Sequence, residues 1–225
     1  MVTLLWSRVN YGIYEGGAVT EDWIERWHTG RTGWHETEGS AALRKHWLGN
    51  DKRVLVPLCG KSRDLLWLEE QGNEVVGVEV AEIAVRSFFE ENGLAFDRKD
   101  GALPVYSARD RRLSIVCGDY YALQDDEFDA HFDRGALIAI APSARERYAE
   151  HTSKLLSADA SQLVITLEYD QDLAGGPPFS VMPEAVTSLW PGLECVERRE
   201  DIGNAPPKFL QAGLESIHEV VWRKG

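Results

Sequence analysis

Apolar runs and amphipathic stretches alternate along most of the chain. Residues 54–58 form a short, apolar and largely β-branched run, which is typical of a strand buried on both faces of a parallel sheet. Residues 64–71 place leucines on one face and glutamates on the other, as an amphipathic helix does, and Gly72 suits a helix C-terminus. A second apolar run at residues 75–78 leads into Glu79. The pattern therefore predicts a strand–helix–strand unit over residues 53–80.

The remaining elements follow from the same periodicities. Helices are predicted at residues 23–28, 40–47, 82–92, 142–156 and 182–189. Further strands are predicted at residues 103–106, 113–117, 128–132, 162–167, 193–199 and 217–222. The first helix is expected to open at Thr20, and the helix at 82–92 is expected to bury Ile83, Val85, Phe88 and Phe89.

Strands and helices alternate until two final strands, which favours a single α/β sheet. The chain has 225 residues, of which 44% are hydrophobic, and this is enough for one core. We therefore expect one domain over residues 1–225, with residues 1–19 as an extended, partly mobile arm. Residues 96–112 are interpreted as irregular apart from the strand at 103–106.

The formal net charge of −13 narrows the range of partners. Such an acidic chain repels the phosphates of nucleic acids and anionic membranes. No apolar run is long enough to span a membrane, and no basic head precedes an apolar N-terminal segment. Cys59, Cys117 and Cys195 form no C-x-x-C pair, so neither a disulfide framework nor a zinc site is indicated. We expect a cytoplasmic monomer with no nucleic-acid, membrane or metal partner.

Gly60 and Glu79 together indicate a nucleoside site. A carboxylate at the tip of a second strand, about twenty residues past a glycine-containing first turn, binds ribose hydroxyls in doubly wound folds. This turn has a single glycine, whereas a pyrophosphate-binding turn uses several, so NAD and FAD are disfavoured. A nucleoside cofactor without phosphates fits better, and the commonest is S-adenosylmethionine. The alternative, in which Gly60 is only a turn glycine and Glu79 a solvated strand end, stays open.

Six motifs in the same order resemble those of the thiopurine S-methyltransferase family. They are Trp23-Ile-Glu-Arg-Trp27, Gly33-Trp34-His35, Val-Pro-Leu-Cys-Gly-Lys at 56–61, Gly77-Val-Glu79, Asp133-Arg-Gly-Ala-Leu137 and Gly176-Pro-Pro-Phe179. The match runs from about Thr20 to the C-terminus. The resemblance implies a Rossmann-like class I methyltransferase that uses S-adenosyl-L-methionine, with a seven-stranded, mostly parallel sheet, helices on both faces and an N-terminal lid over residues 20–47.

The resemblance also implies roles for three tryptophans of the lid. Trp23, Trp27 and Trp34 would surround the methionine and methyl portion of the cofactor. Their aromatic faces suit the positive sulfonium, and each such contact contributes about 0.5–2 kcal/mol. Relatives often carry Phe at the position of Trp34, so the larger indole is expected to affect the acceptor pocket.

The other cofactor contacts implied by the resemblance come from the strand ends. Leu58 and Gly60 would line the cofactor turn, and Glu79 would take the ribose. Asp119 and Tyr120 align with a variable pair that flanks the adenine. The Asp119 carboxylate could accept a hydrogen bond from the adenine amino group.

Arg134 would contact the cofactor or the substrate, and it is our catalytic candidate. Methyl transfer from a sulfonium is an in-line displacement whose reactivity comes from the cofactor, so the protein has to position the acceptor. A thiol or selenol is partly ionised at neutral pH and needs no obligatory general base. We expect a small thiol or selenol acceptor, aromatic or heterocyclic, with tellurium species, sulfide and halides left open.

Other interpretations stay open at this point. One is a nicotinamide-dependent oxidoreductase on a related fold, which the single-glycine turn disfavours. Another is a non-catalytic methyltransferase-like module. Asp133 and Arg134 could also form a simple ion pair at a strand end. Cys59 is interpreted as a packing residue rather than a nucleophile.

Overall fold

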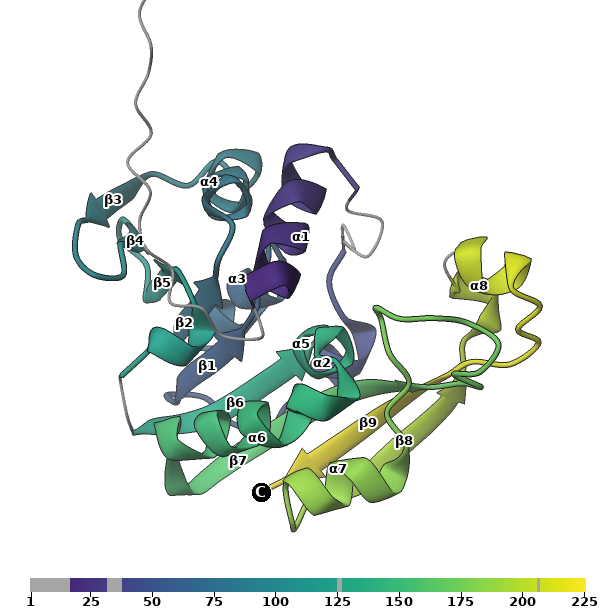
Figure 1. Cartoon of the computed structure of the whole chain (residues 1–225). Helices are drawn as coiled ribbons and strands as arrows, with labels where there is room; N and C mark the ends of the chain where they lie inside the picture. The colour runs from purple at the N-terminus through teal and green to yellow at the C-terminus, as the bar shows by residue number, and fades with distance from the viewer. Residues whose placement is uncertain (1–16, 32–37, 125–126, 206) are drawn as a thin grey trace, which may run out of the picture.

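The computed structural model describes residues 17–31, 38–124, 127–205 and 207–225. Within these residues, strands form one nine-stranded sheet in the order β3-β4-β5-β2-β1-β6-β7-β9-β8 (Figure 1). The strands are β1 Arg53–Pro57, β2 Glu74–Glu79, β3 Phe96–Lys99, β4 Val105–Ala108, β5 Leu113–Cys117, β6 Phe128–Arg134, β7 Leu156–Glu168, β8 Glu194–Glu200 and β9 His218–Lys224.

The centre of the sheet is parallel. Strands β5, β2, β1, β6 and β7 all pair in parallel, while β9 and β8 add antiparallel strands at one end. These seven strands confirm the predicted mostly parallel sheet. The chain moves outward from β1 to β2 and β5 and then returns to place β6 on the other side of β1. The carboxyl ends of β1 and β6 therefore flank a point where the strand order reverses, which is where ligands bind in open α/β sheets.

Two further strands extend the opposite end of the sheet. Strand β4, close to the strand predicted at 103–106, pairs antiparallel with β5, and β3 pairs antiparallel with β4. Strand β3 falls within the stretch interpreted as irregular. Its sequence, FDRK, lacks an apolar face because it lies at the edge of the sheet with three of its four residues exposed.

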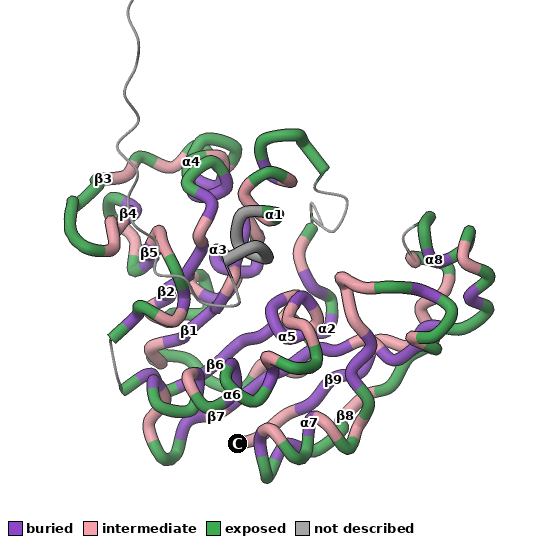
Figure 2. The backbone as a smooth tube through the Cα atoms, in the orientation of Figure 1, coloured by how far each residue is buried: buried purple, intermediate pink, exposed green. Residues whose placement is uncertain are grey.

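Helices cover both faces of the sheet (Figure 1). The helices are α1 Gly17–His28, α2 Ala41–His46, α3 Asp64–Glu70, α4 Glu82–Glu91, α5 Ala136–Ala139, α6 Arg145–Leu155, α7 Pro183–Leu189 and α8 Pro207–Gln211. One buried cluster joins the sheet to α2, α3 and α4, and another joins it to α5, α6 and α7. The central strands are buried along most of their length (Figure 2).

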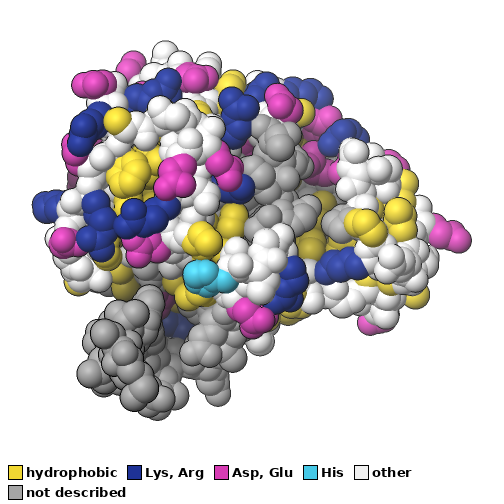
Figure 3. Space-filling view, turned by 90° about the horizontal axis from the view of Figure 1, so that it is seen from above, with side chains coloured by type: hydrophobic (Ala, Val, Ile, Leu, Met, Phe, Trp, Pro, Cys, Tyr) yellow, Lys and Arg dark blue, Asp and Glu magenta, His cyan; other side chains and the backbone are white. Residues whose placement is uncertain are grey.

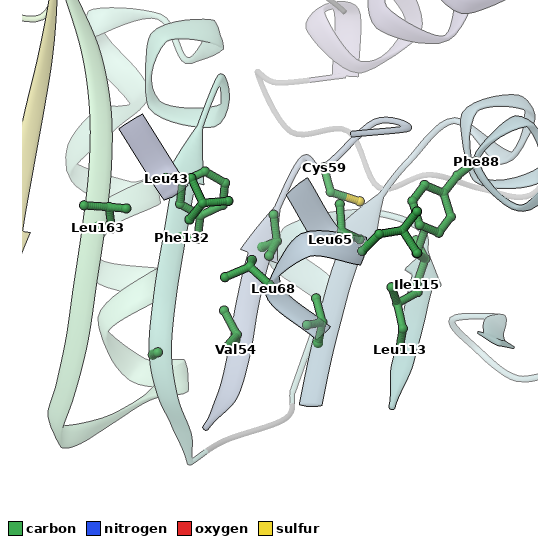
Figure 4. Close-up of a cluster of buried hydrophobic side chains, with 14 of the residues drawn as sticks. Leu43, Val54, Cys59, Leu65, Leu68, Phe88, Leu113, Ile115, Phe132 and Leu163 are labelled. Atoms are coloured by element: carbon green, nitrogen blue, oxygen red, sulfur yellow. The ribbon is translucent and has the colours of Figure 1, made fainter. Parts of the chain in front are cut away.

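In the buried cluster beneath the turn after β1, apolar side chains of the strands and helices pack together (Figure 4). Leu65 and Leu68 of α3 and Phe88 of α4 pack against strand residues such as Ile115 and are fully buried. Cys59 belongs to the same cluster, and burial raises the pKa of its thiol well above the ordinary value. The thiol is therefore protonated near neutral pH, which agrees with its interpretation as a packing residue.

Some predicted details differ from the structure. Helix α1 begins at Gly17, within the stretch taken as an arm and ahead of Thr20. Ile83 is 36% exposed because it lies on the opposite side of α4 from the buried stripe, to which Ala84 belongs instead. The short helices α5 and α8 carry too few residues to show a period and were not predicted. Among the described helices, none has the length and apolar character needed to cross a bilayer.

Candidate functional site

Glu79 lies at the carboxyl end of β2 and is only 6% exposed, so it is not a solvated strand end. Its Oε2 accepts a hydrogen bond from the Gly60 N–H at 2.9 Å, and its Oε1 accepts one from the Ala81 N–H at 2.8 Å. Burial raises the pKa of Glu79, and these two N–H groups partly offset that rise. Each carboxylate oxygen keeps a further lone pair, so the group can still accept two hydroxyls.

The turn after β1 brings backbone close to this carboxylate. Leu58 and Gly60 both have positive φ, of 47° and 54°, and the Cys59 N–H donates to the Val78 carbonyl at 3.0 Å. A Cβ on Gly60 would lie 3.1 Å from Cζ2 of Trp27. Glycine is therefore favoured here both by the left-handed backbone and by the indole that covers the turn.

Helix α1 packs over this turn through Trp27. The indole is 8% exposed and forms a small cluster with Ala81 and Ala84 at the start of α4. Trp23 lies one turn earlier and is half-buried, with the Arg26 guanidinium 5.1 Å from its ring centre. The third predicted tryptophan, Trp34, lies outside the described residues. The structure thus places Trp27 over the Gly60 turn, with Trp23 nearby on the same helix.

Asp119 and Tyr120 follow β5, beside Glu79, because the Gly118 N–H donates to the Glu79 carbonyl at 2.9 Å. Asp119 is exposed, and its carboxylate accepts the Tyr121 N–H at 3.0 Å. Tyr120 points into the core instead, is 5% exposed, and its hydroxyl hydrogen-bonds Thr152 at 2.9 Å. Of this pair, Asp119 is the side chain that can reach a ligand at the sheet edge.

Arg134 is the last residue of β6 and is half-buried. Asp133, just before it, is fully buried, and successive strand residues face opposite sides of the sheet. The Asp133 carboxylate accepts the Leu137 N–H at 3.1 Å and the Tyr148 hydroxyl at 2.7 Å. Burial raises the pKa of Asp133 to about 6. Asp133 therefore fixes the start of α5 directly after Arg134.

A loop between β7 and α7 completes this edge of the sheet. It contains cis peptides before Pro177 and Pro178, and the Phe179 N–H donates to the Ile138 carbonyl of α5 at 2.6 Å. Lys208 of α8 donates to the Pro177 carbonyl, and burial together with the nearby Arg26 lowers the pKa of Lys208. Sequence reasoning missed Lys208 because α8 shows no period and lies about thirty residues beyond the loop that it contacts.

No group of three or more His, Cys, Asp or Glu side chains in the described residues is arranged to hold a metal ion. On the face seen from above, acidic and basic side chains lie intermixed among the described residues (Figure 3).

Comparisons with known proteins agree with this geometry. The family model described as Thiopurine S-methyltransferase (TPMT) matches residues 18–224. The chain is 44% identical over 214 residues to the thiopurine S-methyltransferase of Bordetella petrii, covering 90% of this chain and 96% of the relative. It is 42% identical over 213 residues to that of Pseudomonas fluorescens, covering 89% and 96%.

Solved structures with low sequence identity share the fold. A Burkholderia thailandensis 1,6-didemethyltoxoflavin-N1-methyltransferase, bound to its substrate and S-adenosylhomocysteine, matches with a TM-score of 0.63 at 21% identity, over 99% of this chain and 98% of that one. TehB from Haemophilus influenzae matches with a TM-score of 0.55 at 14% identity, over 90% and 67%. These likenesses show the fold of class I methyltransferases.

Proposed function

This chain belongs to the thiopurine S-methyltransferase family, whose members are S-adenosylmethionine-dependent methyltransferases, and we propose that it methylates a small soft nucleophile. The preferred acceptor is a thiopurine or another aromatic or heterocyclic thiol, and selenium or tellurium species belong to the same class. The family assignment excludes the nicotinamide-dependent oxidoreductase.

The residues at the sheet edge fit the cofactor. The buried Glu79 carboxylate has lone pairs for two ribose hydroxyls, and Asp119 lies beside it to receive the adenine amino group. Leu58 and Gly60 supply the backbone of the turn, with Trp27 above it. Within this proposal, Trp23, Trp34 and the backbone after Tyr120 complete the pocket, and α1 serves as part of the lid.

When bound, the cofactor supplies an electrophilic methyl group on a sulfonium. The chain then has only to hold the acceptor in line and keep water away. Arg134 can hold an anionic acceptor with its planar guanidinium, because a thiol on an electron-poor ring is largely thiolate at neutral pH. The observation that carries this proposal is the placement of Glu79 and Arg134 at the carboxyl ends of β2 and β6, on either side of β1.

A smaller acceptor is the second candidate. The resemblance to the family implies Phe in relatives at the position of Trp34, and the larger indole is expected to narrow the pocket. Sulfide or a halide would then fit better than a thiopurine. We also propose that the protein acts as a monomer in the cytoplasm, a reducing compartment that suits the free thiols of Cys59, Cys117 and Cys195.

The test is a panel of acceptors with labelled S-adenosylmethionine. Rates are compared for a thiopurine, thiophenol, a selenite-derived selenol, iodide and, as a non-soft control, a catecholamine. Arg134→Lys keeps the charge but loses the planar fork, so kcat/KM for a planar anionic acceptor should fall with a smaller effect on cofactor binding. A preference for the catecholamine contradicts the proposal.

A further inference from the structure

Arg145, the first residue of α6, carries a buried charge. It is 7% exposed, and in the described part of the chain no carboxylate lies within ion-pair distance of it. Arginine is rarely buried unless it is paired, because an ion in the interior loses its hydration. The two groups that Arg145 does bind are backbone carbonyls, those of Ser180 at 2.9 Å from Nη2 and of Ile140 at 3.4 Å from Nε.

These two carbonyls belong to different segments of the chain. Ile140 caps the C-terminus of α5, the helix that starts directly after Arg134 and Gly135. Ser180 ends the irregular segment 176–180, which lies between β7 and α7 (Figure 1). The planar guanidinium donates to both acceptors from two nitrogens held in a fixed geometry, whereas the donors of a flexible ammonium are not pre-organised in this way. Arg145 thus links α5 to the segment 176–180. The same two segments are joined by the hydrogen bond from the Phe179 N–H to the Ile138 carbonyl at 2.6 Å.

The segment 176–180 has no regular secondary structure, yet its backbone groups are bonded. The Tyr169 hydroxyl donates to the Pro178 carbonyl at 2.6 Å, and the Ser180 N–H donates to Oε1 of Gln171 at 2.8 Å. A Cβ on Gly176 would lie 2.2 Å from the Phe179 ring, so that ring folds back onto the glycine. A loop bonded in this way presents a fixed surface beside α5.

We propose that Arg145 is a positioning residue that holds the segment 176–180 at a fixed distance from Arg134 and so forms one wall of the acceptor pocket. The inference rests on the proposed function, because it takes the space next to Arg134 as the place of the acceptor. Arg145 reaches this wall through carbonyls and touches no reacting atom. Its effect is on how the acceptor is held, because the proposed cofactor contacts lie elsewhere, with Glu79 at the end of β2 and Gly60 in the turn after β1.

The test compares two substitutions of Arg145. Arg145→Met keeps the apolar stem, and kcat/KM for the acceptor should fall about tenfold, mainly through KM, with the cofactor dissociation constant within about twofold of the native value. Arg145→Lys retains the charge and one bond, so the loss should be smaller, about threefold. The matched control is Lys154→Gln, at an exposed position on the same helix, which should change neither constant.

Tyr169→Phe provides an independent variant, because it removes the Pro178 bond and leaves the ring in place. It should reproduce the rise in acceptor KM, and the double variant with Arg145→Lys should lose less than the product of the two effects, since both side chains hold one segment. Unchanged acceptor kinetics in the Arg145 variants overturns the inference. An equal loss of cofactor affinity and acceptor kinetics also overturns it, because that indicates a general loss of structure.

A second readout needs no acceptor. Amide exchange at Phe179 should quicken in Arg145→Met, while amides of β1 and β2 keep their protection. If the acceptor panel fails with the native protein, the proposed function is wrong, and the exchange at Phe179 still decides whether Arg145 holds the segment. Exchange at the native rate in that variant overturns the inference.

Discussion

The carboxylate of Glu79 accepts a 2.9 Å hydrogen bond from the backbone N–H of Gly60. The residue expected to bind the ribose therefore also holds the turn that we propose lines the cofactor site. Its second oxygen fixes Ala81 at the start of α4, where Trp27 packs. One side chain thus connects the end of β2 with the first turn and with the residues on which Trp27 of α1 packs, and substitutions there are expected to affect both the turn and ligand binding.

Glu79→Ala should weaken S-adenosylmethionine binding about tenfold or more. The change removes a charged acceptor, and each bond to such a group contributes about 1.5–3 kcal/mol. Isothermal calorimetry measures the dissociation constant. Glu74→Ala, at the other end of the same strand and in a surface ion pair with Arg53 at 3.2 Å, is the control and should leave affinity unchanged. An unaltered dissociation constant in Glu79→Ala would sink the ribose assignment.

Gly60→Ala should destabilise the fold by about 1–3 kcal/mol and weaken cofactor binding. The backbone at Gly60 has a φ of 54°, which costs an L side chain about 1–2 kcal/mol, and the new methyl would press on Trp27. Urea unfolding gives the stability. Adding Trp27→Phe to this variant should recover the steric part of the loss but not the backbone part. Equal stability of the single and double variants would show that the indole plays no part.

Amide exchange in residues 23–31 should slow when S-adenosylhomocysteine is added. Among the described side chains, the buried apolar cluster that joins α1 to α4 is small and consists of Trp27, Ala81 and Ala84, so α1 should open more easily than the sheet. Mass spectrometry after exchange reports the protection of each segment, and β1 serves as the internal reference. Equal protection with and without the ligand would mean that α1 is an ordinary packed helix.

His131→Gln should reduce the loss of stability on acidification. His131 is fully buried on β6 beside Gln162 and Asp133, and burial lowers its pKa to about 3. The folded state therefore favours the neutral ring. The contribution of this preference to the free energy of unfolding is complete above pH 6.5 and is lost as the pH falls toward 3. Between pH 7 and pH 5 the native chain should lose about 2 kcal/mol through this group.

The neighbouring Asp133 has the opposite sign, because its pKa is raised to about 6 and its ionisation in the fold is unfavourable. Its contribution to stability grows as the pH falls from about 6 to 4. The difference between His131→Gln and the native chain isolates the histidine. Urea unfolding at pH 7 and pH 5 measures it, with the exposed His28→Gln as the control. If His131→Gln and the native chain lose the same unfolding free energy between pH 7 and pH 5, the direction assigned to the histidine contribution is wrong.

The apolar pattern was sufficient for the parts of the fold that are locally encoded. The run at residues 54–58, the amphipathic residues 64–71 and the glycine stop predicted β1, α3 and β2 to within about a residue. The apolar run at residues 75–78 also predicted that Glu79 lies at the carboxyl end of a strand. These elements were predictable because a buried parallel strand must be apolar throughout and its helix must be apolar on one face.

The resemblance to a known family added roles that no periodicity could provide. Arg134 and Asp119 are ordinary charged residues at strand ends, and only their order with the other motifs indicated a site. The side chain of Tyr120 shows the limit of this reasoning, since it turns inward to Thr152 rather than toward the sheet edge. Which way a side chain turns depends on the helix packed beneath it, and that helix comes about thirty residues later in the chain.

The sequence by itself determined the alternation of strands and helices and the acidic net charge, because each depends on neighbours within about ten residues or on composition. Only the tertiary structure decided that β3 forms the edge strand of the sheet and that Asp133 accepts hydrogen bonds from the Leu137 N–H of α5 and the Tyr148 hydroxyl. It also decided that Arg145 is buried against two backbone carbonyls. Each of these features depends on groups that the order of strands in the sheet brings together. The free energies of burying these groups and of forming their hydrogen bonds arise only when distant segments of the chain meet.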